Sequence, residues 1–591
     1  MHYSSLLLLL AAPSALAKCK CSPGDNCWPS ALKWKALNST VRGRLIANEP
    51  LAMPCYTGDM ERCQEISAGY LDSFTLEKSP IGYQYSPIDT CAPLNTSEPL
   101  AGQPMCDLGN APVYSINATE SDHVAAGIKF AKDNNVRLVI KSTGHDIRGR
   151  SQGYGSLSIW MQNMRPELKF EEKYTSSSNK SCPSDWTGST ITICAGYVWN
   201  DVYSFAAKHG VIVVGGDDMS VGTIGGYIQG GGHGPASHAF GLATDQVLEY
   251  KVVLASGELV TANACQYQDL FTALRGGGGG TYGVVVSATI KAYPTRAVLE
   301  HTLEIVPVAG NQSLLTGAVA EIISKFPTLS DEGFAGVGQL NKMGTQFVYT
   351  HDFGVLLEKN SSSEIAHARE VMTKEVVDAL RKYNGTELLV KSQFQQHNTF
   401  QEYYASGSHY AGAAKGVILI SRFFNKESML HQEKKLTTML DTLFGKLDSG
   451  VQSPAMSLTL ALIGGGEVLK PQPYTSVHPA WRRTYMIAEH IELAPPASGM
   501  AGLRQVWGRA TNEKLKAMKD VTPGMGTYLN EADPYDPDWK EAWYGDRYDE
   551  LKLTKNKYDP DNIFWCWRCV GSEGWDEVKG PSLWGPLCEN K

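Results

Sequence analysis

The chain lacks several features that define common classes of function. Beyond its N-terminus, no apolar run approaches the roughly 20 residues of a membrane-spanning helix. The net charge is -8, so the composition does not favour a basic surface for nucleic acid or an anionic membrane. The fourteen histidines include no His-X-X-X-His pair backed by carboxylates, and no Gly-Lys-Ser/Thr follows the glycine-rich runs. We therefore expect no nucleic-acid partner, no membrane partner, no metal site and no P-loop.

The first 17 residues are typical of a secretory signal peptide. The apolar run Leu6 to Leu10 is followed by Ala15-Leu16-Ala17, which predicts a mature chain that begins at Lys18. Sequons for N-glycosylation stand at Asn38, Asn95, Asn117, Asn179, Asn311, Asn360 and Asn384. We expect a secreted, extracellular glycoprotein that is a monomer.

The thirteen cysteines indicate an oxidising compartment. Their spacing suits local bridges between Cys55 and Cys63, between Cys91 and Cys106, and between Cys182 and Cys194 across a hairpin. The odd number leaves one thiol, for which Cys265 is the candidate. The Cys566-Trp-Arg-Cys569 motif could bind zinc or exchange electrons, but in a secreted chain a structural disulfide is favoured.

The sequence divides into five parts after coarse assignment of helices and strands. The signal peptide (1–17) precedes a Cys-rich extension (18–108), an α+β region with glycine-rich loops (109–295), a second α+β region (296–520) and a C-terminal part (521–591). In the second α+β region, apolar strand-like runs alternate with long amphipathic helices, which predicts an antiparallel sheet. The fold class is therefore α+β.

One strand and the turn after it predict a nucleotide site. The apolar run 136–140 reads as a buried strand and ends in Ser142-Thr143-Gly144, where the chain can turn sharply. The run Gly222 to Gly234 supplies a second glycine-rich loop. Concave turns with exposed backbone N-H groups cradle phosphates, so the two loops are candidates to hold a nucleotide diphosphate.

Four stretches in this order resemble one flavoprotein family. They are 141–146, 221–234, 273–285 and 528–530 followed by 557–564. Together they resemble the vanillyl-alcohol oxidase and p-cresol methylhydroxylase superfamily, especially its berberine-bridge-enzyme-like branch and the secreted isoamyl-alcohol-oxidase-type proteins. The resemblance implies a two-part FAD-binding domain of the PCMH type, from 109–295 and 521–591, with an inserted substrate domain over 296–520.

The resemblance also implies how FAD is held. His145 occupies the position that is commonly bonded to the flavin, and no cysteine stands in 215–221, where many relatives make a second bond. We therefore expect FAD with a single covalent bond through His145. The other expected cofactor-binding residues are Lys141, Ser142, Thr143, Gly144, Asp146, Gly216, Asp217, Val221, Gly222, Gly225, Gly226, Tyr227, Gly232, Leu242, Ala243, Gly283, Val285, Asn530 and Asn562.

The catalytic candidates are Tyr528, Glu531 and Glu467. If 528–531 is a strand, alternation puts Tyr528 and Asn530 on one face and Glu531 on the other. Glu467 follows glycines where relatives carry a carboxylate base, although an exposed turn is the simpler interpretation. His478 and Trp481 are further pocket candidates by the same resemblance. His233 is assigned to packing.

The resemblance implies an oxidase. Hydride would pass from the carbon of an alcohol or carbohydrate hydroxyl to the flavin, and dioxygen would be reduced to hydrogen peroxide. Val221, at a position that gates access of dioxygen in the family, favours this interpretation. The alternatives are a dehydrogenase or oxidative cyclase of a secondary metabolite, and a non-catalytic binding glycoprotein.

Overall fold

The computed structural model describes residues 18–86, 90–93, 106–176, 186–308, 312–385, 387–407, 413–445, 453–493, 499–577 and 584–590. The expected signal peptide, Cys182 and three of the sequons, Asn95, Asn179 and Asn311, lie outside these residues. No helix among the described residues is long and apolar enough to cross a membrane. The α+β fold class is confirmed, with helices packed against mixed and antiparallel sheets.

The first sheet has the strand order β1-β3-β5-β4 and carries the turn that contains His145. Its strands are β1 (Leu45–Ala47), β3 (Tyr114–Asn117), β4 (Leu138–Lys141) and β5 (Leu157–Trp160). Helix α5 (Ser121–Asp133) precedes β4 and buries Val124 and Ile128. Strand β1 comes from the Cys-rich extension and pairs antiparallel with β3, so the extension completes this sheet.

The second sheet, of order β10-β9-β11-β7-β6, is the larger of the remaining sheets in this part of the chain. Its strands are β6 (Lys169–Glu171), β7 (Thr190–Cys194), β9 (Val247–Val253), β10 (Leu259–Asn263) and β11 (Val284–Lys291). Buried β-branched residues such as Ile191, Val252 and Ile290 explain why these runs form strands.

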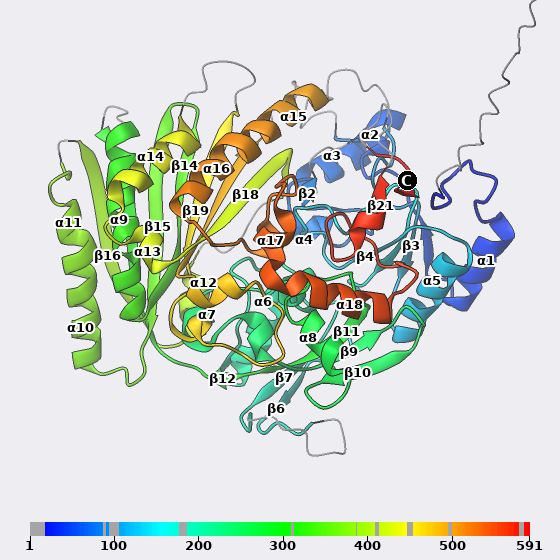
Figure 1. Ribbon diagram of the computed structural model, residues 1–591, viewed down its shortest axis with the longest axis horizontal. Helices are drawn as coiled ribbons and strands as arrows, with labels where there is room; N and C mark the ends of the chain where they lie inside the picture. The colour runs from blue at the N-terminus through cyan, green and yellow to red at the C-terminus, as the bar shows by residue number, and fades with distance from the viewer. Residues whose placement is uncertain are drawn as a thin grey trace, which may run out of the picture.

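The third sheet is the antiparallel sheet that the sequence predicts after residue 296. Its order is β16-β13-β15-β14-β19-β20-β18, and it lies on the left of Figure 1. The strands are β13 (Val298–Pro307), β14 (Phe334–Met343), β15 (Gln346–Leu356), β16 (Leu388–His397), β18 (Val417–Phe424), β19 (Ala455–Leu462) and β20 (Met486–Leu493).

Helices cover one face of this third sheet. They include α9 (Gln312–Asp331), α10 (Ser362–Met372), α14 (Glu433–Phe444) and α16 (Leu515–Val521). Their apolar side chains form a common core with alternate strand residues, for example Met486 and Ala488 of β20. Because strand side chains alternate, the next residues Ile487, Glu489 and Ile491 point to the opposite face. That face is turned toward the FAD-binding part.

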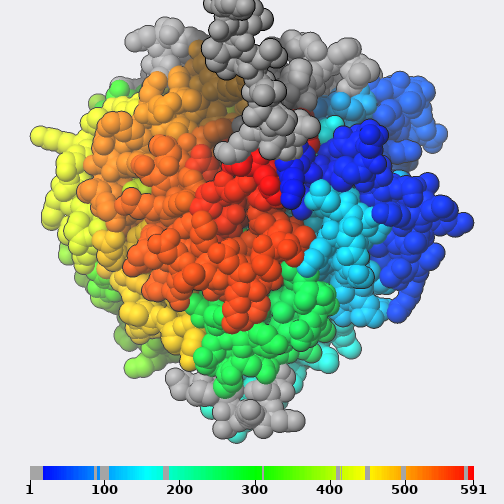
Figure 2. All heavy atoms as spheres, turned by 45° about the vertical axis from the view of Figure 1, so that its right-hand side comes forward, coloured from blue at the N-terminus to red at the C-terminus, as the bar shows by residue number. Residues whose placement is uncertain are grey.

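The two ends of the chain meet. The C-terminal helices α17 (Trp539–Tyr544) and α18 (Tyr548–Tyr558) return to the FAD-binding part, where α18 packs against α8 (Gln268–Leu274). A disulfide joins Cys19 to Cys588, and Figure 2 shows the red C-terminal segment beside the blue N-terminal one. The closed ends hold the Cys-rich extension against the body.

The disulfides confirm part of the sequence prediction and correct the rest. The bridges Cys55–Cys63, Cys91–Cys106 and Cys566–Cys569 are present, and Cys21–Cys27 is a further one. The expected bridge between Cys182 and Cys194 is wrong, because Cys194 carries a free thiol. Cys265, the expected free thiol, is disulfide-bonded. Spacing along the chain misled here because cysteines distant in sequence can pair once the sheets have formed.

Candidate functional site

A cavity of about 480 Å³ lies between the FAD-binding part and the open face of the third sheet. One wall consists of glycine-rich turns at 142–146, 222–227 and 279–283. The other wall consists of side chains from β14, β18, β19 and β20. Residues of both parts of the fold therefore line the cavity.

The turns approach one another so closely that glycine is required. Gly144 has a φ of +85°, and a Cβ there would lie 2.6 Å from the carbonyl oxygen of Gly82. A Cβ on Gly222 would lie 2.3 Å from the Ser142 hydroxyl oxygen. The third turn packs less tightly, since a Cβ on Gly279 would be 3.0 Å from the Cα of Gly226. Backbone atoms therefore make up much of this wall.

Several buried polar atoms at the cavity fit the polar atoms of a flavin nucleotide. Ser142 Oγ, Asp218 Oδ2 and Gln229 Oε1 have no hydrogen-bond partner within the described residues, although all three residues line the cavity. Buried polar groups normally find partners. These atoms and the glycine-rich wall fit the FAD that the sequence predicts.

Most of the expected cofactor residues are brought together. The cavity is lined by Ser142, Thr143, Gly144, His145, Asp146, Gly216, Asp217, Val221, Gly222, Gly225, Gly226, Tyr227, Gly283, Val285 and Asn530. Five others, Lys141, Gly232, Leu242, Ala243 and Asn562, do not line it.

Lys141 supports the first turn from behind. Its ammonium group donates to the carbonyl oxygens of Ser79, at 3.0 Å, and Thr143, at 3.4 Å. Burial lowers the pKa of Lys141 to about 7, and nearby Glu77 opposes this shift. The side chain therefore anchors the turn to the Cys-rich extension.

Of the remaining four residues that were expected at the cofactor, three lie around Tyr528 and the fourth, Asn562, lies in a turn. The backbone N-H of Gly232 donates to the Tyr528 hydroxyl, at 3.2 Å, and that of Ala243 donates to the Gly232 carbonyl, at 2.9 Å. Leu242 is fully buried in the apolar cluster that includes Tyr528. Asn562 occupies a left-handed turn position, with a φ of 49°.

His145 lies at the cavity with its ring held from two sides. Its Nδ1 is 2.5 Å from Oε1 of Gln84 and 4.0 Å from a carboxylate oxygen of Asp218. The Tyr85 ring meets the imidazole edge-on, with ring centroids 5.0 Å apart. Burial lowers the pKa of His145, and the nearby Asp218 opposes this shift. The ring is thus fixed by its surroundings.

Gln84 and Tyr85 are site residues that sequence reasoning missed. Both belong to the Cys-rich extension, and Tyr85 begins the short strand β2 (Tyr85–Ser86), which pairs with β17 (Ala414–Lys415) of the substrate part. The backbone N-H of Gln84 also donates to the Gly144 carbonyl, at 3.0 Å. No motif around Gln84 signals this role.

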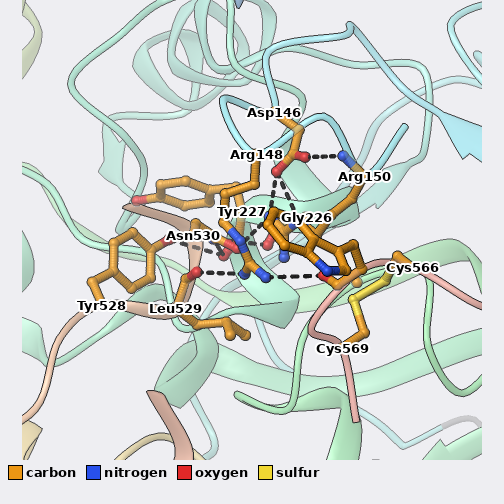
Figure 3. A network of polar contacts seen from close by, with 12 residues as sticks. Asp146, Arg148, Arg150, Gly226, Tyr227, Tyr528, Leu529, Asn530, Cys566 and Cys569 are labelled. Carbon is orange, nitrogen blue, oxygen red and sulfur yellow. Dashed lines mark hydrogen bonds and ion pairs between the residues drawn. A yellow bond between two sulfur atoms is a disulfide. The ribbon is translucent and has the colours of Figure 1, made fainter. Parts of the chain in front are cut away.

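An arginine links the His145 turn to the C-terminal part. Arg150 donates from Nε to Asp146, at 2.8 Å, and from Nη2 to the Asn530 side chain, at 3.0 Å. Arg148 donates to the carbonyl oxygen of Leu529, at 2.8 Å. Figure 3 shows both arginines between the Asp146 turn and the 528–530 segment. This network aligns two segments that are far apart in sequence.

The carboxyl groups of Glu489 and Glu531 meet at the cavity beside His233. A ring nitrogen of His233 and one carboxylate oxygen of each glutamate all lie within 4.8 Å of one another. His233 Nε2 is 3.3 Å from a Glu531 oxygen. Burial raises the pKa of Glu531 to about 7, and its hydrogen bond with Glu489 opposes this shift. Burial, and then the charge of Glu531, raise the pKa of Glu489 well above its usual range. The pair therefore retains a proton near neutral pH.

The position of Glu531 corrects the strand prediction. Residues Leu529–Glu531 form a 3₁₀ turn, so Tyr528, Asn530 and Glu531 all line the cavity instead of alternating. The Ser421 hydroxyl donates to the Glu531 carbonyl, at 2.7 Å, and Ser421 is the register partner of Glu489 on the adjacent strand. This contact brings the two carboxyl groups together.

The prediction that Glu467 is the substrate-side base is wrong. Glu467 lies in a 3₁₀ turn outside the cavity and pairs with Lys470, at 2.5 Å. The carboxylate of the sheet wall is Glu489, which sequence reasoning missed. The available signal was a single acid on the otherwise apolar face of β20, between Ile487 and Ile491.

The other catalytic and pocket candidates lie partly at the cavity and partly away from it. Tyr528 lines the cavity, but burial raises its pKa above the range in which it could act as a base. His233, which was assigned to packing, belongs to the site. His478 Nε2 donates to the Glu541 backbone carbonyl oxygen, at 2.9 Å, and Trp481 packs against Phe423; neither lines the cavity.

The fold and this cavity define a flavin-dependent oxidoreductase, and comparisons with known proteins agree. The family model "FAD binding domain" matches residues 112–263, and "Berberine and berberine like" matches residues 527–568. The chain is similar to the FAD-linked oxidoreductase apf9 of Gibberella fujikuroi, with 39% identity over 98% of this chain and 99% of apf9. It is also similar to the FAD-linked oxidoreductase hmp9 of Hypomyces subiculosus, with 37% identity over 97% of this chain and 90% of hmp9.

A solved structure supports the same assignment. The VAO-type flavoprotein MtVAO713 from Myceliophthora thermophila matches 97% of this chain and 100% of its own, with a TM-score of 0.89 and 37% identity. The chain therefore belongs to the FAD-linked oxidoreductases of the vanillyl-alcohol-oxidase type, with a berberine-bridge-like C-terminal segment. The resemblance seen in the sequence is confirmed.

Proposed function

We propose that this protein is an oxidase that acts on a CH-OH group of a small molecule and uses dioxygen as electron acceptor. The Glu489–Glu531 pair at the cavity wall carries the proposal. FAD, when bound, would accept the hydride. The protein must position the hydroxyl and remove its proton, for which a base with a pKa near working pH and within hydrogen-bond reach is required.

The carboxyl pair meets this requirement. Near neutral pH, Glu489 keeps the shared proton and donates its hydrogen bond to Glu531, so the ionised Glu531 can accept the proton of a substrate hydroxyl. His233 lies beside the pair and burial lowers its pKa, so the neutral ring is favoured. Glu531 is the proposed base and Glu489 sets its protonation state.

His145 is the proposed site of a single covalent bond to FAD. Its place in the cavity and the absence of cysteine in 215–221 support this assignment. The lining residues of the glycine-rich turns are the proposed cofactor contacts. The disulfides support secretion as the proposed localisation, because such bonds persist in oxidising compartments.

The test combines two readouts on the purified protein. We expect flavin absorbance that stays with the chain after acid precipitation, and hydrogen peroxide on addition of a substrate alcohol in air. Anaerobic bleaching of the flavin without rapid reoxidation by dioxygen would contradict the oxidase and favour a dehydrogenase.

One comparison favours an oxidative cyclase or dehydrogenase as the second candidate. The bifunctional decalin synthase calF of Penicillium decumbens is 31% identical over 97% of this chain and 98% of calF. Stopped-flow reoxidation of the reduced protein, measured against dioxygen and against a dye acceptor, separates the two candidates.

A further inference from the structure

A polar row crosses the open face of the substrate sheet, with Ser421 of β18 and Glu489 of β20 at one end. Pairing registers place Glu489 of β20 opposite Thr459 of β19, and Thr459 is aligned with Gln339 of β14. All three side chains line the cavity. One carboxyl, one hydroxyl and one amide therefore form a line across three adjacent strands.

Aliphatic side chains border this polar row on both sides. Ala461 and Val337 are register partners in the row on one side, and Leu419 and Ile491 are partners in the row on the other. All four line the cavity. On the second side the same row continues with Ser457 and Asn341, which do not line the cavity. A ligand in the cavity would therefore meet aliphatic side chains on either side of the polar line.

Exposure increases along the polar row. Glu489 and Thr459 are partly buried, whereas Gln339 is exposed. Neighbouring strands lie about 4.8 Å apart, so the row extends about 10 Å from the carboxyl pair to the amide of Gln339. The amide stands toward the outer end of the cavity wall.

We propose that the polar row selects a substrate with a mainly aliphatic body and two oxygen functions. The first is the hydroxyl that reacts at Glu531 and Glu489. The second is a hydroxyl or carbonyl about 10 Å away, which binds the Gln339 amide, with Thr459 between them. This inference rests on the oxidase proposal for the reacting end only. A densely hydroxylated sugar would leave many polar groups against the aliphatic borders, and burying them without partners is unfavourable.

The experiment compares terminal diols from butanediol to decanediol with the monoalcohols of equal chain length. Both kcat/KM and the dissociation constant, from the shift in flavin absorbance without dioxygen, are measured on the protein with its own flavin. We expect a preference for the diol of about three- to tenfold, the effect of one hydrogen bond, with a maximum where the two oxygens span about 10 Å. Xylobiose is the carbohydrate probe and should bind more weakly.

Variants locate the effect on the row. In Gln339→Leu the ratio of kcat/KM for the diol to that for the monoalcohol should fall to about one. Thr459→Val should reduce the same ratio. Ser457→Val is the matched control, because Ser457 lies on the same strand beside Ile491 and does not line the cavity. It should keep the ratio.

The two proposals fail in different ways. Suppose that no alcohol reduces the flavin, but diols still bind more tightly than monoalcohols and Gln339→Leu removes that difference. The oxidase proposal is then wrong, and the proposal that the polar row binds a second oxygen is supported. Equal binding of diols and monoalcohols, or a diol preference that survives in Gln339→Leu, overturns the polar row.

Discussion

The carboxyl group of Glu489 hydrogen-bonds that of Glu531, although one stands on a β-strand of the substrate sheet and the other ends a 3₁₀ turn of the C-terminal part. Ser421 holds the two elements together through the Glu531 carbonyl. The pair exists only where the substrate sheet and the C-terminal part meet. Its chemistry leads to the first two predictions.

The pH dependence of kcat/KM should report the Glu489–Glu531 hydrogen bond. Because the base must be ionised, kcat/KM should rise as the pH rises through the pKa of Glu531, about 7. Glu489→Leu removes the hydrogen bond that lowers this pKa, so the rising limb should move to higher pH. Glu489→Gln retains an N-H donor and should leave the limb near its original position. An identical shift in both variants would contradict this role.

Loss of the base should lower turnover more than binding. General-base catalysis contributes about 10²- to 10⁴-fold, so Glu531→Gln should reduce kcat by that order in steady-state assays of peroxide release. Glu467→Gln is the control, since Glu467 pairs with Lys470 outside the cavity, and it should retain wild-type kcat. If Glu467→Gln lost as much activity as Glu531→Gln, the assignment of the base would be wrong.

His145→Ala should remove the acid-stable flavin. Mass spectrometry of the denatured chain should show the mass of FAD on the wild type and none on the variant. Asp218→Asn is the matched control, because it alters the charge 4.0 Å from His145 Nδ1 without removing the imidazole, and it should keep the bound mass. Flavin on the His145→Ala chain would refute His145 as the point of attachment.

The Arg150 network should stabilise the fold. Removal of one partner from a buried ion pair costs about 3–5 kcal/mol, so Arg150→Met should lower the free energy of unfolding by that order in denaturant titrations. Arg150→Lys keeps the charge but loses the forked geometry that reaches both Asp146 and Asn530. Its free energy of unfolding should lie between those of the wild type and Arg150→Met. Wild-type stability of Arg150→Met would show that the network is dispensable.

The disulfide between the chain ends should also stabilise the protein. The double change Cys19→Ser and Cys588→Ser opens the longest covalent loop that the described disulfides close, and it should lower the free energy of unfolding by about 2–4 kcal/mol. Cys194→Ser is the control, since this thiol is free, and it should change stability much less. Equal effects would contradict the predicted contribution of the bridge.

Local chemistry explains what could be predicted from the amino-acid sequence. Apolar patterns located β4 and predicted the antiparallel substrate sheet, because each pattern reflects burial of side chains. The glycine-rich turns were recognisable because close backbone approach excludes side chains. His145 was found because it follows such a turn. The family resemblance rested on the same local motifs.

Contacts between distant segments could not be predicted in this way. Gln84 comes to His145 only because the Cys-rich extension packs on the first turn, and Glu489 meets Glu531 only because Ser421 joins the sheet to the C-terminal turn. The pairing of Cys19 with Cys588 likewise requires that both ends return to one place. The sequence by itself determined the glycine-rich turns and several of the strands. The tertiary structure alone decided which acids act together, because proximity across the fold, and not spacing along the chain, sets their shared proton.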